Sequence, residues 1–349
     1  MKKYSTYVGM DCGDRLHRVV VLDGDGDEVT RMTLRNGYED VCDGLAEFPS
    51  SLVAIEVGTH SRWLQRALEE SGHTVVVANA RRLPAITHSA QKTDWRDAEM
   101  LARLVRFDPS LLFPIVHRGR EAQLDLAVLK ARDAVVRVRT ALINTVRGLL
   151  KSEGFRAPSC SADAFAKKVG PTIPKELAQA LAPLVEEIGA LTERIHAYDS
   201  TISALAERYP EVELLRQVTG VGPLTSMGFV LTLEDPDRFA SSRKVGAYLG
   251  LTPRKDQSGD MDKELRITKH GDDYLRRLLV SAAQYILGPL NKKDSALRQF
   301  GLRLAQGGKR AKKRAVVAVA RKLAVLLHRL WVTGEVYEAF PEHAKTEAA

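Results

Sequence analysis

The chain has 349 residues, 44% of them hydrophobic, with a formal net charge of +8 at pH 7, and this length predicts two or three domains rather than one core. No apolar run approaches the roughly 18–20 residues that cross a bilayer, and the N-terminus MKKYSTYVGMD has no sustained apolar stretch, so we expect neither a membrane span nor a signal peptide. Its three widely spaced cysteines, Cys12, Cys42 and Cys160, exclude a disulfide framework and a cysteine-based zinc site and fit a reducing cytoplasm.

Charge is unevenly distributed along the chain. Residues 1–110 hold 14 Lys and Arg against 17 Asp and Glu, whereas residues 243–331 hold 21 against 7. An acidic first third joined to a basic last third predicts that a polyanion is held at one end and that chemistry occurs at the other. The alternative is a solvated basic surface without a ligand.

The first 112 residues have the pattern of a mixed α/β domain. Hairpin strands come first, and a strand–helix–strand–helix order follows. The predicted strands are YVGMD, HRVVVLD, EVTRMTL, SLVAIEVG and TVVVANA, and the predicted helices are SRWLQRALEESG, a short one after residue 80, and one that begins within QKTDWRDAEML.

Four carboxylates stand where this pattern favours apolar residues. Asp11 ends the first strand, Glu56 interrupts an apolar strand, and Asp94 and Asp97 share a helix face. Carboxylates on strands are costly to bury unless they are paired or bind a metal. If the two strands are neighbours and the helix packs across their ends, all four converge, and hard oxygen donors suit Mg²⁺ or Mn²⁺. Such ions could support phosphodiester transfer. The alternative is capping, with Asp94 as the N-cap and Asp97 in the first turn.

The middle of the chain, residues 117–209, predicts two long helices. Apolar residues recur at alternating steps of four and three, which is typical of a coiled coil. We expect a helical hairpin that also contributes to dimer formation. The first seam consists of Leu124, Val128, Ala131, Val135, Val138, Leu142 and Leu149, and the second of Leu177, Leu181, Leu184, Ile188, Leu191, Ile195, Tyr198, Ile202 and Leu205.

Residues 211–335 predict a third, helical domain, followed by a disordered tail over 336–349. LLRQVTGVGPLTSMGFVL has the pattern of a helix-hairpin-helix, whose turn can bind a nucleic-acid phosphate through backbone N–H groups. GGKRAKKRAVVAVARKLAVLLHRL predicts a basic helix start that continues as a buried helix. The candidate nucleic-acid contacts are Arg254, Lys255, Lys263, Arg266, Lys269, Arg276, Arg277, Lys309, Arg310, Lys312, Lys313 and Arg314.

These motifs together resemble a known family. VGMD, AIEVG and KTDWRDAEMLA, followed by TGVGPLTS, FASSRKVGAYLGLTPRKDQSG and RITKHGDDYLRRLL, resemble the DEDD-type insertion-sequence transposases related to Piv-type DNA invertases, which include bridge-RNA-guided serine recombinases. The resemblance covers nearly the whole chain in the same order. Family members have EATG where this chain has EVGT, and the acidic position, Glu56, is kept.

The resemblance implies an RuvC-like (RNase H) fold for the first domain and a metal site at Asp11, Glu56, Asp94 and Asp97. It also implies that Ser258, in the loop KDQSGDM, is a nucleophile that captures a DNA end covalently. Taken alone, a serine in such a loop is more often a turn residue, and Ser226, Ser241 and Ser242 are competing candidates. A guide RNA, double-stranded DNA and a homo-oligomer (dimer or tetramer) are the implied partners, in the bacterial cytoplasm at the nucleoid.

We therefore expect a DNA transposase or recombinase, with α/β and all-α parts, whose metal site and serine form a composite site between subunits. Two alternatives remain. A junction-resolving or RNase H-like nuclease would need the four carboxylates and no serine. A non-enzymatic nucleic-acid-binding scaffold would need neither.

Overall fold

The computed structural model describes residues 4–79, 93–258 and 261–341, and residues 255–258 and 261–264 are described by their backbone alone. The chain forms two compact units, Met1–His117 and Arg118–Ala349. The second unit contains both the long helices and the C-terminal helices, for which the sequence predicts separate domains. Within the described ranges, no helix is long and apolar enough to cross a membrane.

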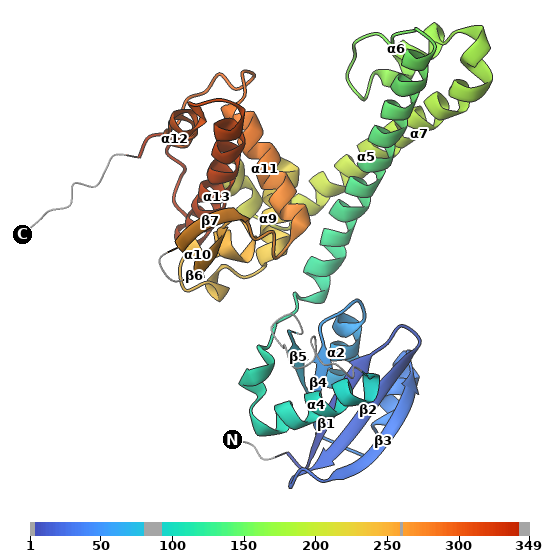
Figure 1. Cartoon of the computed structure of the whole chain (residues 1–349), viewed down its shortest axis with the longest axis vertical. Coiled ribbons are helices and arrows are strands. Elements are labelled where there is room, and N and C mark those ends of the chain that lie inside the picture. Colours follow the sequence, from blue (N-terminus) through green and yellow to red (C-terminus); the bar gives the residue numbers. More distant parts are fainter. Residues whose placement is uncertain (1–3, 80–92, 259–260, 342–349) are drawn as a thin grey trace, which may run out of the picture. The chain divides into compact units, whose positions relative to one another are not determined.

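The first unit contains a five-stranded sheet with the order β3-β2-β1-β4-β5 (Figure 1). β1 pairs antiparallel with β2, and β2 with β3, whereas β1–β4 and β4–β5 are parallel pairs. The predicted strands are confirmed, and so is the adjacency of the first and fourth. Their bounds are Thr6–Cys12 (β1), Leu16–Asp23 (β2), Glu28–Arg35 (β3), Leu52–Glu56 (β4) and Thr74–Ala78 (β5).

Helices cover both faces of this sheet because strand side chains alternate between the faces. Val8, Met10, Val53 and Ile55 face α1 and α2, whereas the alternate residues of the same strands face α4. The sequence did not predict α1, and the short helix that it predicts after residue 80 lies outside the described residues. The bounds are Tyr38–Gly44 (α1), Ser61–Glu70 (α2), Asp94–Phe107 (α4) and Pro109–Leu112 (η2).

The second unit begins with two long helices, α5 (Arg120–Ser152) and α7 (Lys175–Ala206), which fold back on each other. Arg132 pairs with Asp199, and Arg139 contacts Thr192, so the residue numbers of the contacts rise along α5 and fall along α7. The two helices are therefore antiparallel. The predicted helical hairpin is confirmed, and its coiled-coil geometry stays a prediction. α6 (Phe165–Val169) and η3 (Gly170–Thr172) connect the two helices.

The two predicted seams differ in burial. The residues of the second seam are buried or half-buried along α7. In α5, by contrast, Leu124, Val138 and Leu149 are 60%, 51% and 42% exposed, because the residues that face α7 are offset from them and include Ile143 and Val146. The first seam therefore presents apolar side chains to the surface of this chain.

The C-terminal part of the second unit is built around α9, in which every residue from Thr225 to Leu233 is buried. α11 and α13 pack on each other, and buried residues of both belong to the same core as α9. As predicted, α13 begins with exposed basic residues and continues as a largely buried helix. The bounds are Glu211–Arg216 (α8), Pro223–Leu233 (α9), Pro236–Arg238 (η4), Arg243–Tyr248 (α10), Pro253–Ser258 (β6), Met261–Ile267 (β7), Asp273–Leu287 (α11), Ala296–Ala305 (α12) and Lys309–Thr333 (α13).

Candidate functional site

Asp11 and Glu56 lie side by side at one edge of the sheet. β1 and β4 are parallel and paired up to Met10 and Ile55, so the next residue of each strand is one of these carboxylates. Because side chains alternate, Asp11 lies on the face of Tyr7 and Gly9, and Glu56 on the face of Leu52 and Ala54. That is the face covered by α4.

The N-terminus of α4 lies over the same edge. Arg18 of β2 is the residue opposite Asp11 in the antiparallel β1–β2 ladder. Its guanidinium carbon lies 5.1 Å from the centre of the Trp95 ring in the first turn of α4. At the other end, Arg106 donates to the carbonyl of Gly24, close to the start of β1. α4 therefore runs antiparallel to β1 and brings its first turn toward Asp11.

Close packing between α4 and β1 depends on Gly9. A Cβ atom at this position would lie 2.0 Å from the carbonyl oxygen of Ala98 and 2.4 Å from the backbone nitrogen of Ala102. Asp94 and Asp97 stand one turn before Ala98 and Leu101 on this face of the helix. Asp97 is 5% exposed and Asp94 is exposed. All four predicted carboxylates are thus placed at one edge and on one face of the sheet.

The capping alternative for Asp94 is wrong. The N-cap of α4 is Thr93, whose side chain accepts a hydrogen bond from the backbone N–H of Arg96. A hydroxyl residue is a preferred N-cap because it satisfies one of the free N–H groups of the first turn. Asp94 is consequently not needed for capping.

The donor chemistry at this edge fits a divalent cation, but a complete ligand cluster is not formed. Among the residues that the structure describes, no group of three or more His, Cys, Asp or Glu side chains is placed so that it could hold a metal ion. Four carboxylates nevertheless supply the hard oxygen atoms that Mg²⁺ and Mn²⁺ prefer. The fit to a divalent cation therefore rests on the chemistry of the four carboxylates and on their position at a common edge of the sheet.

Cys12, which follows Asp11, is held in its neutral form. Burial, followed by the negative charge of Asp11, raises the pKa of the Cys12 thiol to about 12; a backbone hydrogen bond from Glu56 opposes this rise, and the negative charge of Glu56 adds a smaller increase. A thiol with this pKa is protonated at neutral pH. The electrostatic effect of both carboxylates on one sulfur atom is a second sign that Asp11 and Glu56 are close together.

The sequence did not single out His60, in the loop after β4. Its Nε2 lies 3.3 Å from a carboxylate oxygen of Asp14, in the loop after β1, and its Nδ1 accepts from the indole N–H of Trp63. The side-chain nitrogen of Asn36 lies 3.2 Å from the same imidazole and donates to the carbonyl of Asp14. His60 therefore joins the two loops that follow the strands bearing Asp11 and Glu56.

Ser258 lies in the second unit, at the end of β6. It pairs with Met261, the first residue of β7, in a two-stranded antiparallel hairpin. The base of this hairpin is tightly held: Cβ atoms at Gly250 and Gly271 would lie 2.1 Å from the carbonyl oxygen of His270 and 1.9 Å from that of Tyr248. The side chains of Ser258, Lys255 and Lys263 lie outside the described part of the chain, so their roles stay predictions.

Both units of the chain match known transposases. Residues 8–154 match the DEDD transposase domain of IS110 elements, and residues 212–299 match the transposase IS116/IS110/IS902 family. The chain is a DNA transposase. The transposase is 29% identical to a probable family 20 transposase of Pseudomonas aeruginosa over 93% of this chain and 96% of the relative. It is 28% identical to the transposase for insertion sequence element IS1111A of Coxiella burnetii, over 84% of this chain and 82% of that protein. A pilin gene-inverting protein of Moraxella bovis is 28% identical over 39% of this chain and 42% of its own length.

A transposase is an enzyme that cuts and rejoins DNA, and the non-enzymatic scaffold is thereby excluded. The DEDD domain is consistent with the predicted RNase H-like fold of the first unit, and domains of this kind generally use divalent metal ions. Transposases act on DNA and are generally oligomeric.

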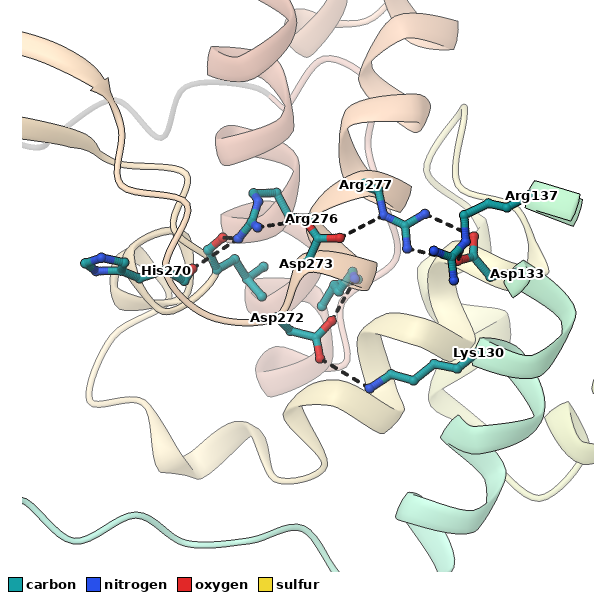
Figure 2. A network of polar contacts seen from close by, with 10 residues as sticks. Lys130, Asp133, Arg137, His270, Asp272, Asp273, Arg276 and Arg277 are labelled. Carbon is teal, nitrogen blue, oxygen red and sulfur yellow. Dashed lines mark hydrogen bonds and ion pairs between the residues drawn. The ribbon is translucent and has the colours of Figure 1, made fainter. Parts of the chain in front are cut away.

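Two predicted nucleic-acid contacts of the transposase have internal partners instead. Arg276 is 8% exposed, and its guanidinium donates to the carbonyls of Leu249 and His270 and to Asp273. Arg277 makes two hydrogen bonds to Asp133 of α5, at 3.0 and 2.9 Å (Figure 2). Arg276 is therefore poorly placed for a phosphate, because it is buried and its donors bind within the protein.

The other predicted basic contacts of the transposase are exposed where their side chains are described. They are Arg254, Arg266, Lys269, Lys309, Arg310, Lys312, Lys313 and Arg314. None of them forms an ion pair with a carboxylate among the described residues, so their charges are available to a polyanion.

The competing serines differ in accessibility. Ser226 is fully buried in α9 and donates to the backbone carbonyls of Gly222 and Pro223, so no substrate can reach it. Ser242 is half-buried, and its Oγ lies 2.9 Å from Nδ1 of His328. The other nitrogen of His328 lies 2.9 Å from the carbonyl of Pro236, which can only accept; in the neutral ring, Nδ1 therefore accepts from Ser242. Ser241 is exposed.

Proposed function

We propose that this transposase cuts and rejoins DNA by phosphoryl transfer assisted by a divalent cation, Mg²⁺ or Mn²⁺, at Asp11, Glu56, Asp94 and Asp97. The observation that carries the proposal is the common edge of β1, β4 and the start of α4. Four carboxylates from elements that are distant in the sequence support the proposal, because they share this edge and one face of one sheet.

The carboxylates of the chain would hold the cation, which when bound supplies positive charge to the scissile phosphate. The carboxylates also need that charge, because without it they repel one another and the DNA. Asp97, the most buried of the four, is fixed by the packing of α4 on Gly9. His60 and Asn36 hold the two loops next to Asp11 and Glu56.

We further propose that Ser258 is the nucleophile. Its oxygen forms a bond to phosphorus while the bond from phosphorus to a deoxyribose oxygen breaks, and the serine proton passes to that leaving oxygen. The reverse step, with the hydroxyl of another DNA end as nucleophile, releases the serine. Each step replaces one phosphodiester with another, so rejoining needs no ATP. The tightly packed base of the β6–β7 hairpin supports a fixed position for this residue.

The carboxylate-only nuclease is the competing chemistry. The family description names the DEDD carboxylates, which favours metal-dependent cleavage and leaves the serine without support of its own. Ser242 is a second competitor, because a histidine nitrogen accepts from its hydroxyl, as in activated nucleophiles.

A guide RNA and a homo-oligomer, dimer or tetramer, belong to the same proposal. Exposed cations of the second unit could bind either nucleic acid. Purification of the transposase with and without ribonuclease treatment, followed by a strand-exchange assay, tests the RNA. If activity survives complete removal of RNA, the guide is excluded.

A covalent-adduct assay tests the chemistry. The purified protein with its co-purifying RNA is incubated with element-end DNA and Mg²⁺ and run on a denaturing gel. We expect a protein–DNA band that is absent with Ser258→Ala and in the presence of EDTA. Asp97→Asn should reduce the amount of this adduct by about 100-fold or more. Ser242→Ala should retain it.

The matched control is Glu99→Gln on the same helix. Glu99 binds Arg31 and Arg103 instead of belonging to the DEDD set, and its substitution should leave the adduct unchanged. Cleaved DNA without an adduct, unaffected by Ser258→Ala, would establish the carboxylate-only nuclease. An adduct lost in Ser242→Ala alone would transfer the nucleophile to Ser242.

A further inference from the structure

The second unit contains a large groove that the carboxylate and serine chemistry does not use. Its volume is about 1700 Å³, which exceeds the roughly 300–1,000 Å³ of sites for single small molecules. α13 lies along the groove, and its walls come from the base of the β6–β7 hairpin, from α12 and from the C-terminal segment around Tyr337. Figure 1 labels α12, α13, β6 and β7 in the second unit.

The charge of the groove is strongly one-sided. Nine of its lining residues are Lys or Arg, and one, Glu338, is acidic. Arg329 pairs with Glu335, and Lys322 lies 4.0 Å above the ring of Phe300. Arg310, Lys313, Arg314 and Arg321 form no ion pair with any carboxylate in the described ranges. The charge of the groove therefore favours a polyanionic ligand.

The cations of α13 alternate with apolar side chains along one face of the helix. Arg310, Lys313 and Arg314 form a first band and Arg321 and Lys322 a second, with Arg329 beyond them. The bands repeat every seven to nine residues, which is roughly 11–14 Å at 1.5 Å per residue. Val317 and Ala318 fill the first interval, and Val325 and Leu326 the second.

This alternation distinguishes between nucleic acids. A duplex presents phosphates on its outside and keeps its bases stacked inside, so it would meet the cations and leave the apolar intervals uncovered. A strand with unpaired bases offers both parts, because phosphates bind Lys and Arg while bases occupy apolar surface. We propose that the groove binds a segment of unpaired nucleotides.

The groove also touches the base of the hairpin that carries the proposed nucleophile. Leu265, Arg266 and Ile267, which line it, belong to the hairpin that carries Ser258. A strand in the groove would thus continue along the hairpin toward this serine. This link rests on the proposed function; the binding itself does not. The segment could come from DNA or from RNA, since both offer phosphates and bases.

Fluorescence anisotropy with the full-length protein tests the proposal. The probes are a labelled oligothymidylate, an oligouridylate of the same length, and a DNA duplex. Lys313→Glu/Arg321→Glu, inside the groove, should weaken binding of a single strand about tenfold or more and lower the slope of log K against log salt by about 1.4, since each lost phosphate contact of a single strand contributes about 0.7. The preferred probe, DNA or RNA, identifies the source.

The matched control is Lys292→Glu/Lys293→Glu, which makes the same charge change in the same unit, outside the groove and away from the predicted nucleic-acid contacts. It should alter binding less than about threefold, because the general field is screened. All four side chains are exposed, so circular dichroism should show folded variants. Val317→Thr/Val325→Thr should weaken the single strand while it leaves the duplex unchanged.

Three results would overturn the proposal. Equal losses in the groove pair and its control would show a diffuse electrostatic effect. Equal losses for duplex and single strand would assign the groove to duplex DNA. Unchanged nucleic-acid binding with lost self-association would assign it to an acidic segment of another copy. Because the assay measures binding, the adduct experiment on Ser258 and Asp97 can fail without affecting it.

Discussion

At the scale of single residues, the carboxylate edge depends on a position without a side chain. Gly9 lies under α4, and the atoms that an added Cβ would meet are backbone atoms of Ala98 and Ala102. Backbone cannot rotate away as a side chain can. Any substitution must move the helix, and Asp94 and Asp97 move with it.

We therefore expect Gly9→Ala to lower the free energy of unfolding of the first unit by about 1–3 kcal/mol or more and to abolish metal-dependent cleavage. Gly24→Ala is the control, because nothing lies within 4 Å of its added Cβ; it should cost less than about 0.5 kcal/mol. Urea denaturation and the cleavage assay measure the two effects. A Gly9→Ala enzyme with normal stability and activity would contradict the described packing of α4.

At the scale of elements, two neighbouring arginines of α11 have different roles. Arg276 binds the carbonyls of Leu249 and His270, which lie before and after the β6–β7 hairpin, so it closes the base that carries Ser258. Arg277 joins α11 to α5 through Asp133. Arg277 also donates a hydrogen bond to Asp273, which lowers the pKa of the Asp273 carboxyl. Figure 2 shows both sets of contacts at the start of α11.

Arg276→Leu should lower the free energy of unfolding by at least about 2 kcal/mol, because it leaves buried carbonyls without a donor. Arg277→Leu should cost about 1 kcal/mol or less, since a half-exposed ion pair contributes little. Neither should change the salt dependence of DNA binding, in contrast to the role that the sequence predicts. If Arg276→Leu gives a folded protein with a smaller slope of log K against log salt, Arg276 is a nucleic-acid contact as the sequence predicts.

At the scale of the whole molecule, α5 carries apolar surface that this chain does not cover. Leu124 and Val138, both from the predicted first seam, are more than half exposed. Apolar residues at coiled-coil spacing are expected to pair with another helix. A second copy of the chain is the partner that agrees with the oligomeric character of transposases.

Leu124→Glu/Val138→Glu should shift the protein toward smaller species in light scattering, because charges oppose burial of the seam. Thr140→Glu, an exposed position outside the seam, should leave the mass unchanged. If the composite site forms between subunits, mixing Asp97→Asn and Ser258→Ala chains should restore adduct formation, and the seam substitutions should remove this rescue. Unchanged mass would place the interface elsewhere.

The sequence by itself determined the strands of the first unit, the two long helices and the buried course of α13, and it singled out the four carboxylates as a candidate site. These follow from local periodicity and from charges at positions that favour apolar residues, and both signals are local. Its motifs also indicated a transposase. Packing details were not accessible, because Thr93 and Asp94 are equally acceptable caps until the helix start is known.

Only the tertiary structure decided which polar residues are available to a ligand. Arg276 and Arg310 look alike in the sequence, yet one closes a hairpin and the other lines a groove. His60 gained its role because two loops meet, and Gly9 because a helix crosses its strand. Burial and partners depend on contacts between distant segments, and a sequence pattern reports only what lies within a turn or two of each residue.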